Sequence, residues 1–275
     1  MPNYKIIASD LDGTLLNTQM QVSKENLDAI QKMTDMGIYF VPSSGRTLTE
    51  MPKEVMDITS ARYIIHSDGA VVYDRKTNKN LSSCCMDKQH SKEILDILNS
   101  YQTLLTVRNK GISYVDSKKH DWDIYDSYRL TGNYKKFIYE KNRPVDNYDE
   151  FCYSLDEIEM ICVFFSYDDE LAQCRQRILD LGEYQVASSE RYNLEIFSKD
   201  AGKGNALLRL AEILGVDPKE TIGVGDSIND MDNLKKAGLS LAMENAQVEL
   251  KSIADRVICN NDEHAMEYIL KNIIK

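Results

Sequence analysis

The first chemically suggestive feature of the chain is a pair of carboxylates, Asp10 and Asp12, that follows the apolar stretch 6–9. Side chains two residues apart on an extended chain point the same way, and Gly13 then lets the chain turn. Two carboxylates this close repel each other unless a cation lies between them or one of them carries a proton. The pair therefore indicates either a cation-dependent site or an Asp-Gly turn capped by Thr14, and the local sequence leaves both open.

Two more carboxylates, Asp226 and Asp230, follow another apolar stretch, 221–225, late in the chain. Buried parallel strands have continuous apolar sequences of this kind, and ligands bind beyond their carboxyl ends. Acids that follow two such strands should therefore meet at one edge of a sheet. Oxygen ligands of this type suit Mg²⁺ better than Zn²⁺, because no Cys or His stands near these acids.

Groups that could bind an anion occur at two other places. Ser44, Gly45 and Arg46 follow the apolar stretch 38–41, and Lys203 stands between two glycines before a strongly amphipathic helix. Free N–H groups at a helix N-terminus favour anions, and Arg presents a planar fork to phosphate. Taken in isolation, an ordinary Ser cap with solvated Arg and Lys side chains is the simpler interpretation.

Alternating apolar strands and amphipathic helices must position these groups. Ser23 is expected to cap a helix that ends at Gly37, with the strand 38–41 directly after it. A strand at 63–65 and a hairpin over 71–81 follow. This βαβ pattern predicts an α/β fold built on a parallel sheet.

The character of the sequence changes from about Cys84 to Arg191. Two β-rich runs, 104–107 and 112–115, are separated by Asn109-Lys110-Gly111, which is typical of a hairpin turn. Polar helices and loops are expected over 118–157, and a strand, a helix and another strand over 158–187. This mixture predicts an inserted α+β module.

Composition limits the classes of function. The chain has 275 residues, 43% hydrophobic and 28% charged, which is typical of a soluble globular protein, and its length predicts either one large domain with an insertion or two domains. No apolar run approaches the roughly 20 residues that span a bilayer, so we expect a cytoplasmic protein without a membrane partner. The six cysteines show no metal-binding spacing, and disulfides are not expected. The formal net charge of −11 disfavours nucleic acid but allows a small anionic substrate in a local pocket.

Four stretches together resemble the four motifs of the haloacid dehalogenase (HAD) superfamily. In order and spacing they are Asp10-Leu11-Asp12-Gly13-Thr14, Ser44-Gly45-Arg46, Gly202-Lys203-Gly204 and Gly225-Asp226-Ser227-Ile228-Asn229-Asp230. The insertion after the second motif makes the chain similar to the Cof-type members, subclass IIB. The resemblance implies a Rossmann-like, doubly wound parallel-sheet core, residues 1–83 and 192–275. It also implies a C2B cap of α+β type, residues 84–191, that sets substrate specificity.

The resemblance further implies a Mg²⁺-dependent phosphatase. Asp10 matches the nucleophile that forms an aspartyl-phosphate, and Asp12 matches the general acid and base. The metal ligands would be the side chain of Asp10, the backbone carbonyl of Asp12 and Asp226, with Asp230 binding directly or orienting water molecules. The remaining matches concern the phosphoryl group: Ser44 and Lys203 would hold its oxygens, and Leu11, Gly45, Arg46 and Asn229 would contribute to the same site.

Three residues depart from the Cof-type pattern: Asp68 replaces a usual Asn, Gly202 a usual Ser and Glu244 a usual Gly. No catalytic group is lost, and the two acidic changes are expected to disfavour highly anionic leaving groups. The expected substrate is a small phosphorylated metabolite, either a sugar phosphate or a cofactor phosphate such as pyridoxal phosphate. A phosphomutase and a non-hydrolytic, receiver-like phospho-acceptor stay open as alternatives. The protein is expected to be a monomer or a homodimer.

Overall fold

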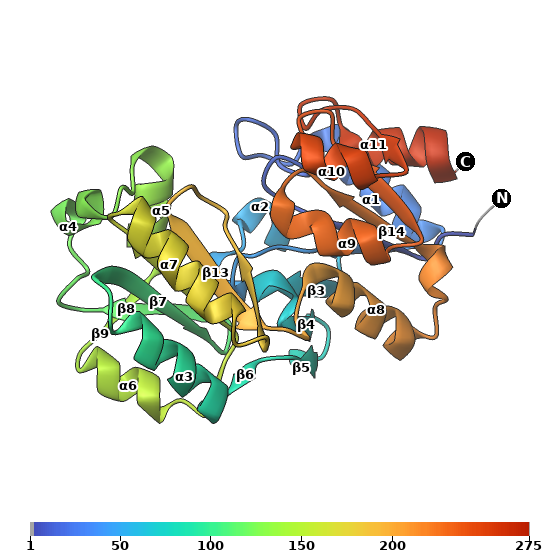
Figure 1. The fold of residues 1–275 in the computed structure, drawn as a ribbon. Helices are drawn as coiled ribbons and strands as arrows, with labels where there is room; N and C mark the ends of the chain where they lie inside the picture. The colour runs from blue at the N-terminus through green and yellow to red at the C-terminus, as the bar shows by residue number, and fades with distance from the viewer. Residues whose placement is uncertain (1–2, 275) are drawn as a thin grey trace. The chain divides into compact units, whose positions relative to one another are not determined.

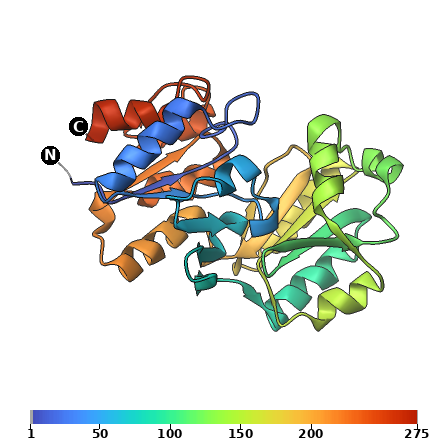
Figure 2. The same cartoon turned by 180° about the vertical axis from the view of Figure 1, so that it is seen from behind.

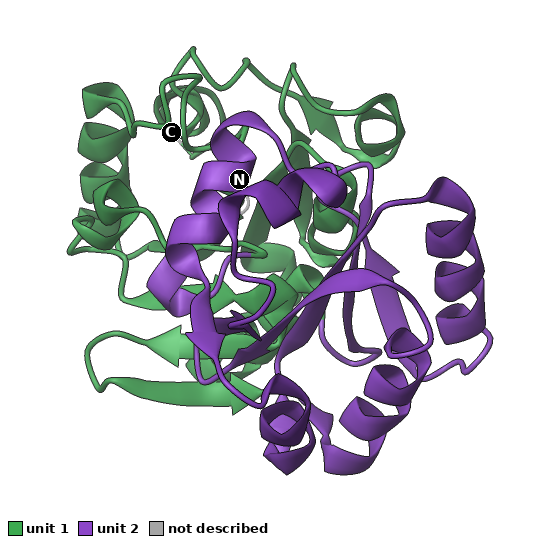
Figure 3. Cartoon of the chain, turned by 90° about the vertical axis from the view of Figure 1, so that its left-hand side faces the viewer, with its two compact units in different colours: residues 1–45, 51–83, 202–275 green, residues 46–50, 84–201 purple. Residues whose placement is uncertain are grey.

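The computed structural model describes residues 3–274 and divides into two compact units (Figure 3). Unit 1 comprises Met1–Gly45, Met51–Ser83 and Gly202–Lys275, and unit 2 comprises Arg46–Glu50 and Cys84–Ala201. The ends of the predicted core segments, residues 1–2 and 275, lie outside the described residues. The chain enters unit 2 after Ser83, where the sequence predicts the start of the insertion. It returns to unit 1 after Ala201, whereas the predicted insertion ends at Arg191.

Unit 1 is built on a five-stranded parallel sheet with strand order β16-β15-β14-β1-β2. The strands are β1 (Ile6–Ser9), β2 (Tyr39–Pro42), β14 (Thr221–Gly225), β15 (Leu239–Ala242) and β16 (Arg256–Val257). β1 pairs with β14 on one side and with β2 on the other, and all four of its residues are buried. The chain segments that end β1, β2 and β14 therefore emerge together at one edge of the sheet.

Helices cover both faces of this sheet (Figures 1 and 2). Helices α1 (Lys24–Asp35) and α11 (Ala265–Ile269) pack together on one face, and α8 (Lys203–Leu214) and α9 (Met231–Lys236) lie on the other. The hydroxyl oxygen of Ser23 accepts a hydrogen bond from the Asn26 N–H at 3.2 Å, so the predicted N-cap of α1 is confirmed. The arrangement confirms the predicted Rossmann-like, doubly wound core.

A second, antiparallel sheet of unit 1 packs against α8. Its strands are β3 (Tyr63–His66), β4 (Val71–Asp74) and β5 (Lys79–Ser83), which contain the predicted hairpin. The short helices α2 (Lys53–Met56) and α10 (Val248–Ile253) complete the unit.

Unit 2 is built on a six-stranded sheet with strand order β12-β13-β11-β7-β8-β9, in which only β8 and β9 pair in parallel. Its strands are β7 (Thr103–Asn109), β8 (Ile112–Asp116), β9 (Arg143–Val145), β11 (Met160–Phe165), β12 (Tyr184–Ala187) and β13 (Asn193–Ser198). The predicted hairpin turn through Asn109 and Gly111 joins β7 to β8. Because β13 pairs with both β11 and β12, residues beyond Arg191 belong to unit 2.

The two faces of this sheet have different cores. Helices α3 (Lys88–Leu98), α6 (Tyr148–Ser154) and α7 (Asp168–Leu179) cover one face, where Val107 and Ile161 are fully buried. Helices α4 (Trp122–Ser127) and α5 (Gly132–Lys141) pack against Leu104 and Phe164 on the other face. A two-stranded ladder, β6 (Met86–Asp87) with β10 (Glu157–Ile158), completes this α+β unit.

The six cysteines are free thiols. Within residues 3–274, no helix combines the length and the apolar character that crossing a membrane requires.

Candidate active site

The centre of the site is a buried ammonium between two carboxylates. Lys203 is the first residue of α8, and its Nζ lies 2.7 Å from Oδ1 of Asp10 and 2.6 Å from Oδ1 of Asp230. Asp10 directly follows β1, and Asp230 belongs to the loop after β14. Lys203 and Asp230 have no exposed surface, and Asp10 is 5% exposed. The structure thus brings together residues from three predicted motifs.

The loop after β14 is folded around the Asp230 side chain. The Oδ2 atom of Asp230 accepts hydrogen bonds from the backbone N–H groups of Asp226 and Ser227, at 3.0 and 3.2 Å. A Cβ on Gly225 would lie 2.4 Å from Cγ of Asp230, so the close approach requires glycine there. With Oδ1 at Lys203 and Oδ2 at two N–H groups, Asp230 fixes the geometry of its neighbours.

Three carboxylates in unit 1 are grouped as ligands of a cation would be. Asp10, Asp226 and Asp230 each offer an oxygen, and these atoms lie within 4.8 Å of one another. An all-oxygen set of carboxylates is the type that Mg²⁺ prefers. The side chain of Asp12 is exposed and is not part of this group.

The electrostatics of this group also fit a bound cation. Burial, with Asp230 adding to it, raises the pKa of Asp10 well above its usual value, while Lys203 opposes this shift. Burial and the neighbouring Asp230 raise the pKa of Asp226 from 3.8 to about 7. A divalent cation held by these oxygens would favour their charged forms and cancel the repulsion. The residues present therefore fit a divalent metal ion.

Lys203 stays positively charged in this setting. Burial works against its charge, but Asp10, Asp230 and Asp68 together hold the pKa of Lys203 well above its usual value. An ammonium held at this edge of the sheet can neutralise an anionic group that binds beside it.

The turn between Asp10 and Thr14 packs closely against the Asp226 side chain. The carbonyl of Leu11 accepts hydrogen bonds from the N–H groups of Thr14 and Leu16, at 3.2 and 2.9 Å, and the Leu11 side chain is buried. Gly13 has φ +77°, and a Cβ there would lie 2.4 Å from Oδ2 of Asp226. Gly13 therefore serves two purposes, a left-handed backbone and close approach to a candidate metal ligand.

Ser44 lies at the same edge of the sheet. The preceding residue, Ser43, donates its backbone N–H to the carbonyl of Ser9 at 2.8 Å, which ties the end of β2 to the end of β1. Ser44 is buried, and its own N–H donates to the carbonyl of Ile65 at 3.0 Å. Gly45 follows as the last residue of this part of unit 1.

Two other predicted site residues have different surroundings. Asn229 is half-buried in the loop after β14, where its Oδ1 accepts a hydrogen bond from the Ser227 hydroxyl at 2.6 Å. Arg46 folds with unit 2: its guanidinium lies 4.5 Å from the ring centre of Phe137 and donates to the carbonyl of Glu50 at 3.2 Å.

The sequence did not predict the role of Asp232. Its Oδ2 accepts hydrogen bonds from the N–H groups of Gly204 and Asn205, at 2.9 and 3.1 Å, in the first turn of α8. Asp232 is thus an N-terminal cap supplied by another helix, which helps to hold Lys203 in place. Apart from being an acid, Asp232 carries no sequence pattern that indicates this role, because its partners lie 27 and 28 residues earlier in the chain.

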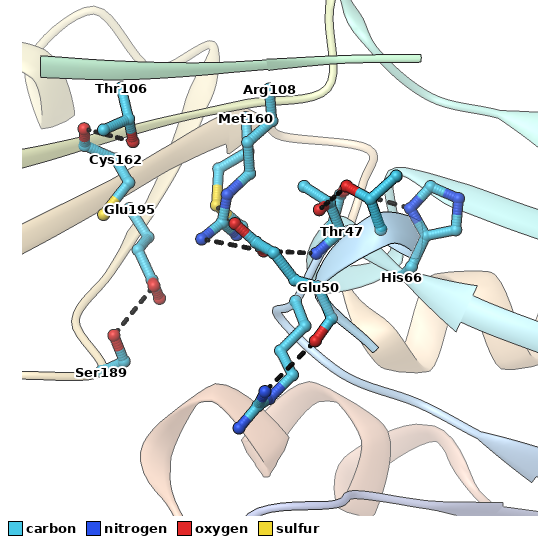
Figure 4. Close-up of polar contacts among 12 residues, drawn as sticks. Thr47, Glu50, His66, Thr106, Arg108, Met160, Cys162, Ser189 and Glu195 are labelled. Atoms are coloured by element: carbon cyan, nitrogen blue, oxygen red, sulfur yellow. Dashed lines mark hydrogen bonds and ion pairs between the residues drawn. The ribbon is translucent and has the colours of Figure 1, made fainter. Parts of the chain in front are cut away.

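Unit 2 contains a separate cluster of buried polar side chains (Figure 4). The Arg108 guanidinium lies 3.8 Å from Oε2 of Glu50, which also accepts the Thr47 N–H at 2.7 Å. Glu195, from β13, accepts a hydrogen bond from the Ser189 hydroxyl at 2.9 Å. The three charged residues are at most 4% exposed, so the segment Arg46–Glu50 is bound to unit 2 through buried groups.

Comparison with known proteins identifies the class. The family model of haloacid dehalogenase-like hydrolases matches residues 7–270. Phosphatase YwpJ of Bacillus subtilis (strain 168) is 30% identical over 296 residues, covering 98% of this chain and 100% of the relative. The 5-amino-6-(5-phospho-D-ribitylamino)uracil phosphatase YwtE of the same organism is 30% identical over 285 residues, covering 98% of each chain.

Solved structures agree. A haloacid dehalogenase-like hydrolase from B. subtilis has 31% identity and a TM-score of 0.81, covering 98% of this chain and 99% of that chain. A sugar phosphatase of HAD subclass IIB has a TM-score of 0.82 over 97% of this chain and 98% of its own, at 17% identity, and shows a common fold. The chain belongs to the haloacid dehalogenase-like hydrolase family. Within that family it is a phosphatase, as the four motifs predict.

Proposed function

We propose that this protein is a Mg²⁺-dependent phosphomonoester hydrolase that works through an aspartyl-phosphate on Asp10. The observation that carries the proposal is the buried group of Asp10, Lys203 and Asp230, with Asp226 beside it. A carboxylate is a weak nucleophile in water, and it needs positive charge around the phosphoryl oxygens to attack phosphorus. Lys203 supplies one positive charge, and the carboxylates of Asp10, Asp226 and Asp230 could bind a metal cation that supplies a second.

The chemistry divides into two displacements. An Oδ atom of Asp10 attacks phosphorus, the ester P–O bond breaks, and Asp12 protonates the departing alcohol oxygen. Asp12, now a carboxylate, takes a proton from a water molecule as that water attacks phosphorus, which releases inorganic phosphate and restores Asp10. When bound by Asp10, Asp226 and the Asp12 carbonyl, Mg²⁺ would neutralise the phosphoryl charge.

The other predicted residues have supporting roles in this proposal. Ser44 and Lys203 hold phosphoryl oxygens, with backbone groups of Leu11 and Gly45 and the Asn229 side chain beside them. Asp230 either binds the metal directly or orients its water molecules, and it also orients Lys203 and the Asp226 loop. Arg46, which folds with unit 2, contacts either the phosphate or the cap side.

The proposed substrate is a small phosphorylated metabolite, either a sugar phosphate or a cofactor phosphate such as pyridoxal phosphate. YwtE, whose name gives a phosphorylated ribitylaminouracil as its substrate, supports this class of ester. Unit 2, which contains the predicted cap residues 84–191, is proposed to set the choice among such esters. We place the protein in the cytoplasm, and its six free cysteines suit a reducing compartment.

Phosphate release tests this proposal. Purified protein is mixed with p-nitrophenyl phosphate and with a panel of sugar and cofactor phosphates, with and without Mg²⁺. We expect Mg²⁺-dependent release that the substitution Asp10→Asn reduces by at least about 10³-fold, because the nucleophile is lost. Release that is equally fast in Asp10→Asn, or unaffected by removal of divalent ions, would contradict the proposal.

A further inference from the structure

Asp68 is held between the two loops that carry Ser44 and Lys203. Its backbone N–H donates to the carbonyl of Ser44 at 3.2 Å, and its carbonyl accepts the N–H of Gly202 at 2.9 Å. The residue adopts a left-handed conformation, with φ 48° and ψ 40°, in the turn after β3. All of these residues belong to unit 1.

The carboxylate of Asp68 lies against the Ser44 loop. A Cβ on Gly45 would lie only 3.0 Å from Oδ2 and 3.1 Å from Oδ1 of Asp68, and the residue is 1% exposed. Its negative charge also acts on the Lys203 ammonium, for which it is one of the stabilising partners. A buried carboxylate thus lies beside groups proposed to hold the phosphoryl oxygens.

The reaction proposed above makes no use of this carboxylate. Asp68 is outside the group of acids that could hold a metal ion, and neither displacement needs it. A fixed negative charge at such a place nevertheless affects which ligand binds. Because it is buried, it acts through its charge: it repels a second phosphate or a carboxylate on the substrate and favours neutral hydroxyl or cationic ammonium groups there.

We propose that Asp68 is a specificity-determining residue that selects phosphate monoesters with a hydroxylated or aminated leaving group and no second anionic group. This inference rests on the proposed hydrolase function. It narrows the substrate class to esters such as those of polyols and amino sugars.

Asp68→Asn is the informative substitution, because it removes the charge and keeps the size. Asn also tolerates the left-handed conformation, so the turn should keep its shape. The matched control is Asp28→Asn, which removes the same charge from the exposed face of α1. The substrate pair is glycerol phosphate and phosphoglycerate, which differ mainly in one carboxylate.

We expect the wild type and Asp28→Asn to prefer glycerol phosphate to the same degree. In Asp68→Asn, the kcat/KM of phosphoglycerate relative to glycerol phosphate should rise about tenfold, chiefly through KM, as one removed charge at short range predicts. A merely structural role of Asp68 would lower turnover of both esters alike. An unchanged ratio in Asp68→Asn would overturn the proposal.

A binding measurement separates this inference from the hydrolase proposal. Calorimetric titration of both esters into Asp10→Asn, with and without Asp68→Asn, needs no turnover and is done in the presence of Mg²⁺. If the wild type hydrolyses neither these two esters nor any ester of the panel above, but the binding ratio still shifts with Asp68→Asn, the hydrolase proposal fails and the role of Asp68 stands. Binding ratios that are equal in the two proteins overturn the role of Asp68, whatever the turnover.

Discussion

The charge balance of the site depends on single residues that are buried beside one another. Burial, and after it the repulsion among Asp10, Asp226 and Asp230, raises the pKa of Asp10 and of Asp226, and Lys203 offsets only part of these shifts. Without a cation, Asp226 in the folded protein therefore binds a proton more readily than it does in the unfolded chain.

This proton uptake predicts how stability depends on pH. Because the pKa of Asp226 is raised from 3.8 to about 7, the folded state binds more protons than the unfolded state between these values. The free energy of unfolding of the metal-free protein should therefore contain a contribution that falls as pH rises from about 4 to 7. Urea denaturation over this range, in wild type and in Asp226→Asn, measures the contribution.

Asp226→Asn should show a weaker decline, since its side chain does not titrate. Saturating Mg²⁺ should also reduce the decline in the wild type, because the ion binds the carboxylate forms. Equal pH dependence in the wild type and the variant, each without metal, would refute this account of Asp226.

Four of the residues that the sequence indicated for the site lie together in unit 1. Asp10, Asp226 and Asp230 were indicated by their places after apolar strands and Lys203 by the resemblance of the four motifs, and the fold of unit 1 brings them together. The sequence did not predict the cap that Asp232 forms. That role depends on the packing of α9 against α8, which no local pattern encodes.

At the scale of elements, tight turns decide how closely the motifs approach. Gly13 combines φ +77° with a close contact to the Asp226 side chain, whereas Gly37, at the end of α1, has φ +82° and open space around it. The two glycines have the same backbone requirement and differ in what a methyl group would meet.

This difference predicts the effects of two Ala substitutions. Both should lower the free energy of unfolding by about 1–2 kcal/mol through the left-handed conformation. Gly13→Ala should also weaken Mg²⁺-dependent turnover by at least about tenfold, because the new Cβ displaces Asp226. Urea denaturation and phosphate-release kinetics give the two quantities.

Gly37→Ala should keep the wild-type turnover and serves as the control for backbone strain. Normal turnover and normal Mg²⁺ dependence in Gly13→Ala would show that the position of Asp226 does not depend on this turn.

The elements themselves were largely predictable. The N-cap at Ser23, the strand 184–187 and the hairpin turn at Asn109 follow from local chemistry, and each is confirmed. The end of the insertion was not predictable from the sequence, because β13 joins the sheet of unit 2 through pairing with β11 and β12. Such pairing is a long-range property that periodicity does not reveal.

At the scale of the whole molecule, the chain consists of a doubly wound unit with an α+β unit inserted in it. The short segment Arg46–Glu50 folds with the inserted unit although it directly follows Ser44 and Gly45. Its attachment rests on buried Glu50, on the Arg46–Phe137 contact and on a hydrogen bond from the Thr49 N–H to the Gly111 carbonyl. The sequence predicted that this segment belongs to the core domain. The prediction was wrong because the segment is bound to unit 2 only through tertiary contacts, which local sequence does not reveal.

For the whole protein, the proposed mechanism requires that Asp10 becomes covalently phosphorylated during turnover. The most direct measurement is chemical trapping: the full-length enzyme is mixed with substrate and Mg²⁺, quenched, and treated with borohydride, which reduces an acyl phosphate to an alcohol. Peptide mass spectrometry should then find homoserine at position 10, dependent on substrate and on Mg²⁺. Continued phosphate release with Asp10 unmodified, or with the label on another residue, would contradict the account.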